Sequence, residues 1–126
     1  MITPVQQILT DAAVLLEERG WGQGNDTIRT ADQGGAMCLN LALGAAPNED
    51  LETFRAAQYA LINHLSLEVV TEYDRFAGLM REMPGVTLVN WNDAPGRTAR
   101  EVTDALRGAA LSVVVDTLAA AEEAMA

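Results

Sequence analysis

The sequence TPVQQILTDAAVLLEERG, residues 3–20, carries both the start and the stop signals of a helix and decides the fold class. Thr3 is the expected N-cap, Pro4 stands at the first helical position, and Gln6 completes a capping-box spacing. Gly20 then offers a left-handed stop. A helix over residues 4–19 is therefore predicted, and the apolar residues that recur along it with the helical period are Val5, Ile8, Leu9, Ala12, Leu15 and Leu16.

Three helices are predicted in the middle of the chain. Residues 36–46 are small and apolar, and their alanines and lack of β-branched residues favour a helix over a strand. Asn48 or Asp50 can cap the next helix, over 50–65, whose first turn is acidic. Ser66 is a candidate N-cap for a further helix over 67–83. The alternative is that 50–65 and 67–83 form one kinked helix. Pro84-Gly85 is expected to end this run.

The clearest helix start is WNDAPGRT, residues 91–98. Thr98 and Glu101 have the spacing of a capping box, so the last helix begins after Thr98. It is predicted to continue to about residue 123, although Gly108 in its middle disfavours a helix by about 1 kcal/mol relative to alanine.

The remaining segments predict little β structure. The glycine-rich stretch 20–35 is a loop, with Trp21 as an anchor to the core and at most one extended piece at 27–30. Residues 86–89 form a short extended segment that is too brief for a sheet unless it pairs with 27–30. We therefore expect a mainly α protein: one domain over 1–126, a compact bundle of about five helices and at most one two-stranded pairing.

Composition narrows the functional classes. The chain has 126 residues with 49% hydrophobic content, which suits one domain with one core. No stretch is long and apolar enough for a membrane span, and no secretory signal is visible. A single cysteine, Cys38, agrees with a reducing compartment, so a cytoplasmic location without membrane association is expected.

The formal net charge of −10 argues against direct nucleic-acid binding. Residues 1–47 hold five acids against two arginines, residues 48–85 seven against three, and residues 86–126 six against three. Because the excess is spread evenly, it favours a solvated acidic surface. A decoy that imitates DNA is the alternative.

The sequence gives little support for a catalytic function. Cys38, His64 and Asp93 are the residue types of a thiol hydrolase, but such a triad is defined by geometry, and Cys38 lies in an apolar run where a buried, inert thiol is usual. One Cys and one His are too few for a zinc site, and no nucleotide-binding or serine-hydrolase motif occurs. We expect no metal and no cofactor.

Two features suggest binding instead. In the 91–98 turn, Trp91 and Arg97 have no obvious capping or turn role, so they form either an exposed recognition pair or a packed cation–π contact. Beyond Gly108, the last helix has little polar surface. It is either a central core helix or an interface with a partner or a second subunit, whose contacts would include Leu111, Val114 and Leu118.

The motifs LLEERGW (15–21) and WNDAPGRTAREV (91–102) resemble an uncharacterised family of small proteins from actinobacteria and their phages, a domain of unknown function. The likeness covers about half of the chain and leaves out residues 48–83. There, Phe54, Tyr59, Tyr73 and Phe76 are expected to give this chain a surface of its own. The resemblance carries over no catalytic or binding residue.

These observations predict a small cytosolic accessory protein, encoded by an actinobacterium or a phage. It would act without catalysis, by binding a host protein, another protein or itself. The alternatives are a small thiol-dependent enzyme that uses Cys38 and His64, and an acidic inhibitor that imitates DNA.

Overall fold

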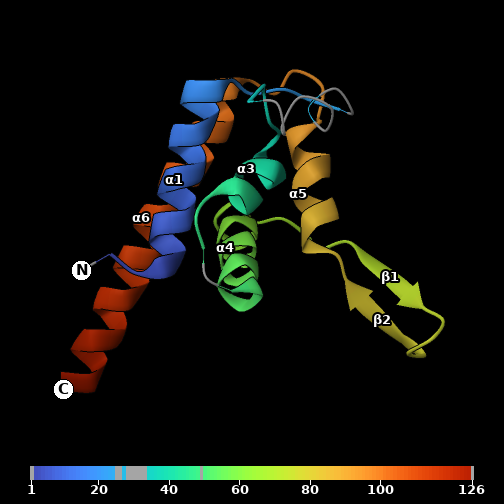
Figure 1. Ribbon diagram of the computed structural model, residues 1–126. Coiled ribbons are helices and arrows are strands. Elements are labelled where there is room, and N and C mark those ends of the chain that lie inside the picture. The colour runs from blue at the N-terminus through green and yellow to red at the C-terminus, as the bar shows by residue number, and fades with distance from the viewer. Residues whose placement is uncertain (1, 25–26, 28–33, 49, 126) are drawn as a thin grey trace.

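A computed structural model describes residues 2–24, 27, 34–48 and 50–125. Within these ranges the chain forms five helices and one two-stranded antiparallel sheet, so the mainly α fold is confirmed. The elements in chain order are α1 (Pro4–Arg19), α3 (Leu39–Ala45), α4 (Leu51–His64), β1 (Thr71–Asp74), β2 (Leu79–Glu82), α5 (Pro84–Asn92) and α6 (Ala99–Met125) (Figure 1).

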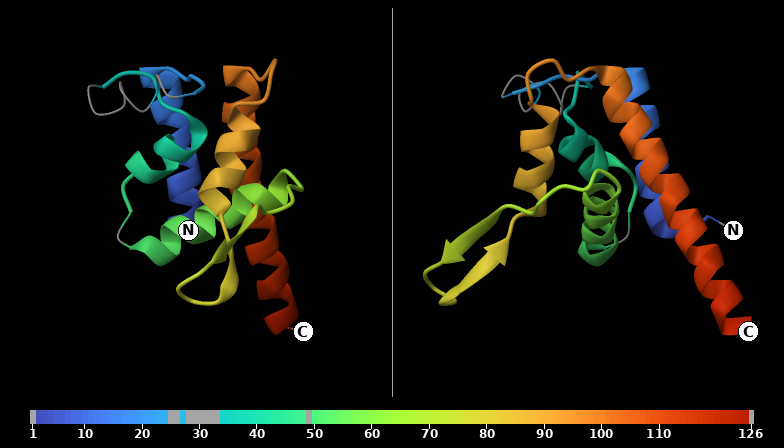
Figure 2. Two further views of the ribbon diagram at one scale, coloured as in Figure 1. Left: turned by 90° about the vertical axis from the view of Figure 1, so that its right-hand side faces the viewer. Right: turned by 180° about the vertical axis from the view of Figure 1, so that it is seen from behind.

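The first and last helices pack antiparallel along one side of the molecule (Figures 1 and 2). Both capping boxes are present: Thr3 and Gln6 begin α1, and Thr98 and Glu101 begin α6. The Arg107 side chain forms an ion pair with Glu17 across the two helices. Both helices therefore start where the sequence predicts, because their caps are local signals.

A single hydrophobic cluster joins the helices. The apolar face predicted for α1 faces this core, with Ile8 and Leu9 fully buried. The short helix α3 is buried at its centre, as its apolar composition predicts. Only the first part of α6 contributes to the core, through Val102, Ala105, Leu106, Ala109 and Ala110.

The predicted helix over 67–83 is wrong. Ser66 does not cap a new helix but has a positive φ, 54°, immediately after Leu65, the C-cap of α4. The chain then forms the β1–β2 hairpin, in which Tyr73 pairs with Met80. The turn is closed by the Asp74 carboxylate, which accepts hydrogen bonds from the backbone N–H groups of Phe76 and Ala77, at 2.9 and 3.0 Å. The short Asp side chain and the flexible Gly78 (φ 68°) favour this reversal over a helix.

The predicted extended segment over 86–89 is also wrong, because these residues lie inside α5. Pro84 does not end a helix but stands at the first helical position of α5, where its missing N–H costs nothing. The two-stranded pairing therefore lies at 71–74 and 79–82 and not near 27–30 and 86–89. Residues 28–30 lie outside the described part of the chain.

The hairpin projects from the helices, as does the end of α6 (Figure 1). The base of the hairpin is hydrogen-bonded to α5. The Val70 N–H donates to the Thr87 hydroxyl at 2.9 Å, and the N–H of Met83, the N-cap of α5, donates to the Val70 carbonyl at 2.7 Å.

Within the described ranges, no helix has both the length and the apolar character needed to cross a membrane.

Candidate functional site

The WNDAPGRT segment is organised around Asn92, whose side chain is fully buried. Its Oδ1 accepts hydrogen bonds from Trp21 Nε1 at 2.6 Å and from the Leu39 N–H at 3.0 Å. Its Nδ2 donates to the Gly22 carbonyl at 3.1 Å and to Asp93 Oδ1 at 3.0 Å. Both amide donors and both acceptor sites of this side chain are thus used. Asn92 joins the loop after α1, the start of α3 and the end of α5.

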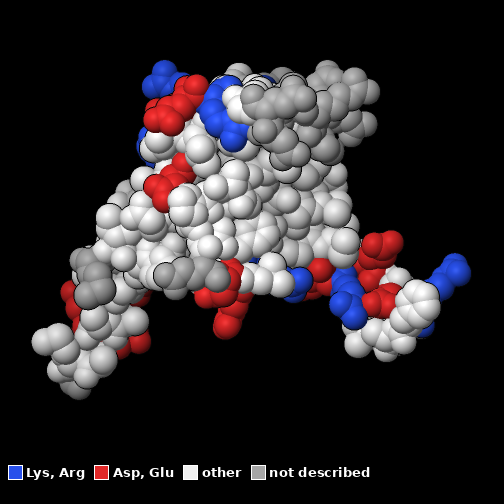
Figure 3. Space-filling view, viewed as in Figure 1, with Lys and Arg blue, Asp and Glu red and all other residues white. Residues whose placement is uncertain are grey.

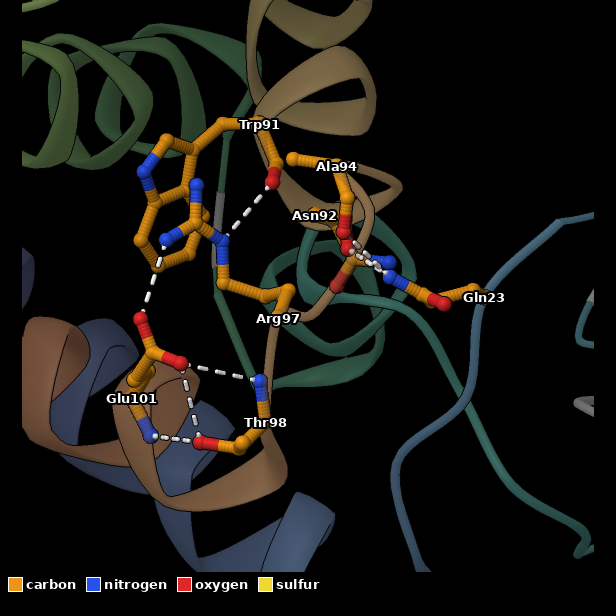
Figure 4. Close-up of polar contacts among 7 residues, drawn as sticks. All are labelled: Gln23, Trp91, Asn92, Ala94, Arg97, Thr98 and Glu101. Carbon is orange, nitrogen blue, oxygen red and sulfur yellow. Dashed lines mark hydrogen bonds and ion pairs between the residues drawn. The ribbon is translucent and has the colours of Figure 1, made fainter.

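The same loop makes further contacts to this turn. Gln23 Nε2 donates to the carbonyls of Asn92 and Ala94, at 2.9 and 3.0 Å (Figure 4). The Gly24 N–H donates to Asp93 Oδ1 at 3.1 Å. Trp21 packs against the core, which confirms its predicted role as an anchor. The polar residues of the motif are therefore occupied in holding the fold together.

Arg97 and Trp91 form the packed contact and not an exposed pair. The Arg97 guanidinium lies over the Trp91 ring, 3.9 Å from its centroid, and Arg97 Nε donates to the Trp91 carbonyl at 3.0 Å (Figure 4). Arg97 Nη1 also reaches Glu101 Oε2 at 3.1 Å. The turn and the capping box of α6 are thereby joined through one arginine.

These contacts lower the pKa of Glu101 below its ordinary value of 4.5, chiefly through the hydrogen bond from Arg97 and next through that from Thr98. A carboxylate whose pKa is lower in the folded state stabilises the fold above its unfolded pKa, and this stabilisation is lost as the pH falls through the folded value. We therefore predict that Glu101→Gln lowers stability at pH 7 but much less at pH 3. Urea unfolding of both proteins at the two pH values measures this, and an equal difference at both would contradict it.

The three residues of the thiol-hydrolase hypothesis are not joined to one another. Cys38 is buried at the start of α3. Asp93 bonds the Gly24 N–H and the Asn92 side chain, while His64 Nδ1 lies 3.2 Å from Ser112 Oγ on α6. Among the described residues, no hydrogen bond or ion pair links any two of the three candidates.

His64 instead contacts Ser112, and both residues line a surface pocket together with Asp116. Ser112 Oγ donates its proton to the Gly108 carbonyl at 3.1 Å, so its oxygen is left to accept from the Nδ1–H of His64. A nucleophilic serine needs the reverse, with its proton passing to the imidazole. The cluster is therefore a structural contact between α4 and α6.

Gly108 is explained by this contact. A Cβ at this position would lie 2.5 Å from His64 Nε2, so an alanine here would force the exposed imidazole to move from its place against α6. Replacing a mid-helix glycine by alanine normally stabilises a helix by about 1 kcal/mol. We predict that Gly108→Ala yields this full gain only in a His64→Ala background and less in the native chain. Urea unfolding of the four proteins measures the difference, and equal gains in both backgrounds would contradict it.

Two elements project from the body of the molecule: the end of α6, at the lower left of Figure 3, and the β1–β2 hairpin, at the lower right. Both projections expose large apolar side chains. On the hairpin, Phe76 is completely exposed and Tyr73 is 58% exposed. On α6, Leu111 and Leu118 are 64% and 61% exposed, whereas Val114 is half-buried. The second half of α6 is therefore not a central core helix.

Metal ligands are not gathered in the part of the chain that the structure describes, where no three His, Cys, Asp or Glu side chains lie close enough to hold an ion. The chain is thus a small, mainly helical protein, and its most distinctive motif, WNDAPGRT at residues 91–98, holds the fold together through a buried polar network. The chain belongs to a family of unknown function, DUF6197, whose model matches residues 1–112. The match includes residues 48–83, which the sequence motifs alone leave out. No curated protein and no solved structure matches the chain significantly.

Proposed function

We propose that this chain is a cytosolic accessory protein of an actinobacterium or of one of its phages, and that it acts without catalysis by binding another protein or itself. The motifs at 15–21 and 91–102 are the basis for the expected origin. The observation that carries the binding function is the exposure of large apolar side chains on two elements that project from the core.

The hairpin is the first of these elements. A two-stranded hairpin is only marginally stable in water, yet this one exposes Phe76 and Tyr73 together with Leu79 and Met80, at 50% and 57%. Apolar area covered by a partner is worth about 25 cal/mol per Å², so docking on this hairpin would be favourable. The ion pair between Arg81 and Asp74 lies within the hairpin and leaves its apolar tip uncovered.

The alternatives have less support. A thiol-dependent enzyme needs an accessible thiolate with a base, whereas Cys38 is buried and His64 is engaged with Ser112. A DNA decoy needs regularly arrayed acids, whereas the face in Figure 3 has separate acidic groups with wide uncharged areas between them. Protein binding agrees with both observations.

The test is affinity capture from an actinobacterial lysate with three forms of the chain. The native protein is expected to retain a discrete partner, and the double variant Tyr73→Ser/Phe76→Ser is expected to lose most of it. Leu51→Ser is the matched control, because Leu51 is also exposed, at 63%, but belongs to α4 and not to the hairpin. Equal capture by all three forms, or none by the native protein, would contradict the hairpin's role.

A further inference from the structure

The outward face of α6 carries a row of five side chains, which we name the outer stripe. An α-helix turns by about 100° per residue, and the intervals of four, four, three and four residues keep the row within about 40° of one line. From the N-terminal end, its members are Arg107, Leu111, Val115, Leu118 and Glu122.

The apolar part of the outer stripe faces away from the protein body, whereas Arg107 at its N-terminal end reaches Glu17 of α1. The residues of α6 that enter the core, such as Val102, Leu106 and Ala109, lie on the opposite side of the same helix. Leu111, Val115 and Leu118 are accordingly exposed, at 64%, 57% and 61%. In the view from behind, α6 lies nearest to the viewer, and its end passes beyond the start of α1 (Figure 2, right). A second helix can therefore lie along the stripe without meeting the rest of the chain.

The outer stripe is complementary to a second copy of itself that runs in the opposite direction. Val115 lies at the centre, leucines stand four residues before it and three after it, and opposite charges stand eight before and seven after. A twofold axis near Val115 would place Leu111 of one chain opposite Leu118 of the other. It would also place Arg107 opposite Glu122, and each such pair would differ by about 1.5 Å along the helices.

We propose that the outer stripe binds the outer stripe of a second copy of this chain as an antiparallel helix pair. This proposal rests on the proposed binding function. It specifies a second copy of the chain as the partner of α6. The ion pair and the leucine pair each form twice because the contact is symmetric. The two protein bodies lie on opposite sides of the paired helices.

A parallel pair is disfavoured by the same residues. It would bring Arg107 against Arg107 and Glu122 against Glu122, and it would align two helix dipoles unfavourably. In the antiparallel pair, the negative C-terminal end of each helix lies toward the basic end of the other stripe. The Arg107 guanidinium already bonds Glu17 through Nη1, and its other N–H groups can donate to a carboxylate of the second chain.

The contact is small, since about four helical turns from each chain take part. Interfaces below about 1,200 Å² are weak and transient, so we expect a dissociation constant on the order of 100 μM. The chain is expected to be monomeric at low micromolar concentration and substantially dimeric at about 0.5 mM. Sedimentation equilibrium over this range measures the association.

Charge reversal tests the geometry. Arg107→Glu alone would oppose two acids at each end of the dimer, and Glu122→Arg alone would oppose two arginines. Each variant is expected to associate about tenfold more weakly than the native chain. An equimolar mixture is expected to form a heterodimer, because the acidic side chain introduced at position 107 of one chain then meets the basic side chain introduced at position 122 of the other. At the opposite end of this heterodimer, the native Glu122 meets the native Arg107. The mixture should recover the native affinity to within about threefold.

Circular dichroism establishes that both variants are folded, as exposed positions should allow. Asp116→Arg serves as the control, because it reverses an exposed charge on the side of α6 opposite the stripe and should leave the association unchanged within about threefold. A native chain that stays monomeric at about 0.5 mM would overturn the proposal. So would a dimer whose affinity neither variant changes, or a mixture that associates no better than its components. None of these results would affect binding through the hairpin, which the capture experiment tests separately.

Discussion

Replacing Asn92 by leucine is expected to destabilise the protein by about 3–5 kcal/mol, the largest effect of any single change considered. Leucine has a similar size but no polar atoms, so Trp21 Nε1, the Leu39 N–H and the Gly22 carbonyl would lose their partner. Each buried polar group left unpaired costs about 1–3 kcal/mol. Urea unfolding measures the change, and the melting temperature should fall by about 10–20 °C.

Asn90→Leu is the matched control. Asn90 lies on the same helix, α5, but is exposed, so its replacement should change stability by less than about 0.5 kcal/mol. If Asn92→Leu proved as mild as this control, the Asn92 network would not be the element that joins α1, α3 and α5. The role assigned to the WNDAPGRT motif would then be wrong.

Gly20→Ala is expected to destabilise the protein by about 2 kcal/mol, for a reason of backbone conformation. Gly20 has φ 96° and ψ 154°, a region that only glycine adopts readily, at a cost of about 1–3 kcal/mol for other residues. Its N–H donates to the Leu16 carbonyl at 2.9 Å and its carbonyl accepts from the Met37 N–H at 3.0 Å. Because both bonds fix this conformation, alanine cannot relax without losing one of them.

Gly24→Ala is the matched control, at a second uncrowded glycine with a positive φ. The φ of Gly24 is 72°, and a Cβ there would meet nothing within 4 Å. Its replacement should cost only about 1 kcal/mol. An added Cβ at Gly20 would be 3.7 Å from the Ala36 Cβ, an ordinary contact, so steric overlap does not explain the larger effect. Equal unfolding free energies for the two variants would contradict the conformational argument.

The parts of the fold that depend on local signals could be predicted from the sequence. The capping boxes at Thr3 and Thr98 fix the starts of α1 and α6, since both partners of each box lie within one turn. The middle could not be predicted in this way. Its apolar residues at intervals of three and four fit a helix, but the Asp74 turn and the contact of Val70 with Thr87 select a hairpin. The second of these contacts spans 17 residues of sequence.

The candidate site was predictable to a similar extent. The sequence singles out residues 91–98 and offers the Arg97–Trp91 contact as one interpretation, which the structure confirms. It does not reveal that Asn92 bonds Trp21, because these residues are 71 positions apart. On α6, the sequence suggests Val114 as a binding residue, but the rotation of the helix exposes Val115 instead. That rotation follows from which residues enter the core.

The central claim is that this chain binds proteins through its two projections, and site-specific photo-crosslinking in living cells tests it most directly. A photoreactive phenylalanine analogue would replace Phe76, Leu118 or, as a control, Leu51, which are all exposed. The account predicts discrete covalent adducts from position 76 and none from 51. From position 118 it predicts an adduct with a second copy of the chain once the protein is concentrated enough to dimerise, at about 0.5 mM. No adduct from either projection, or the same adducts from position 51, would contradict it.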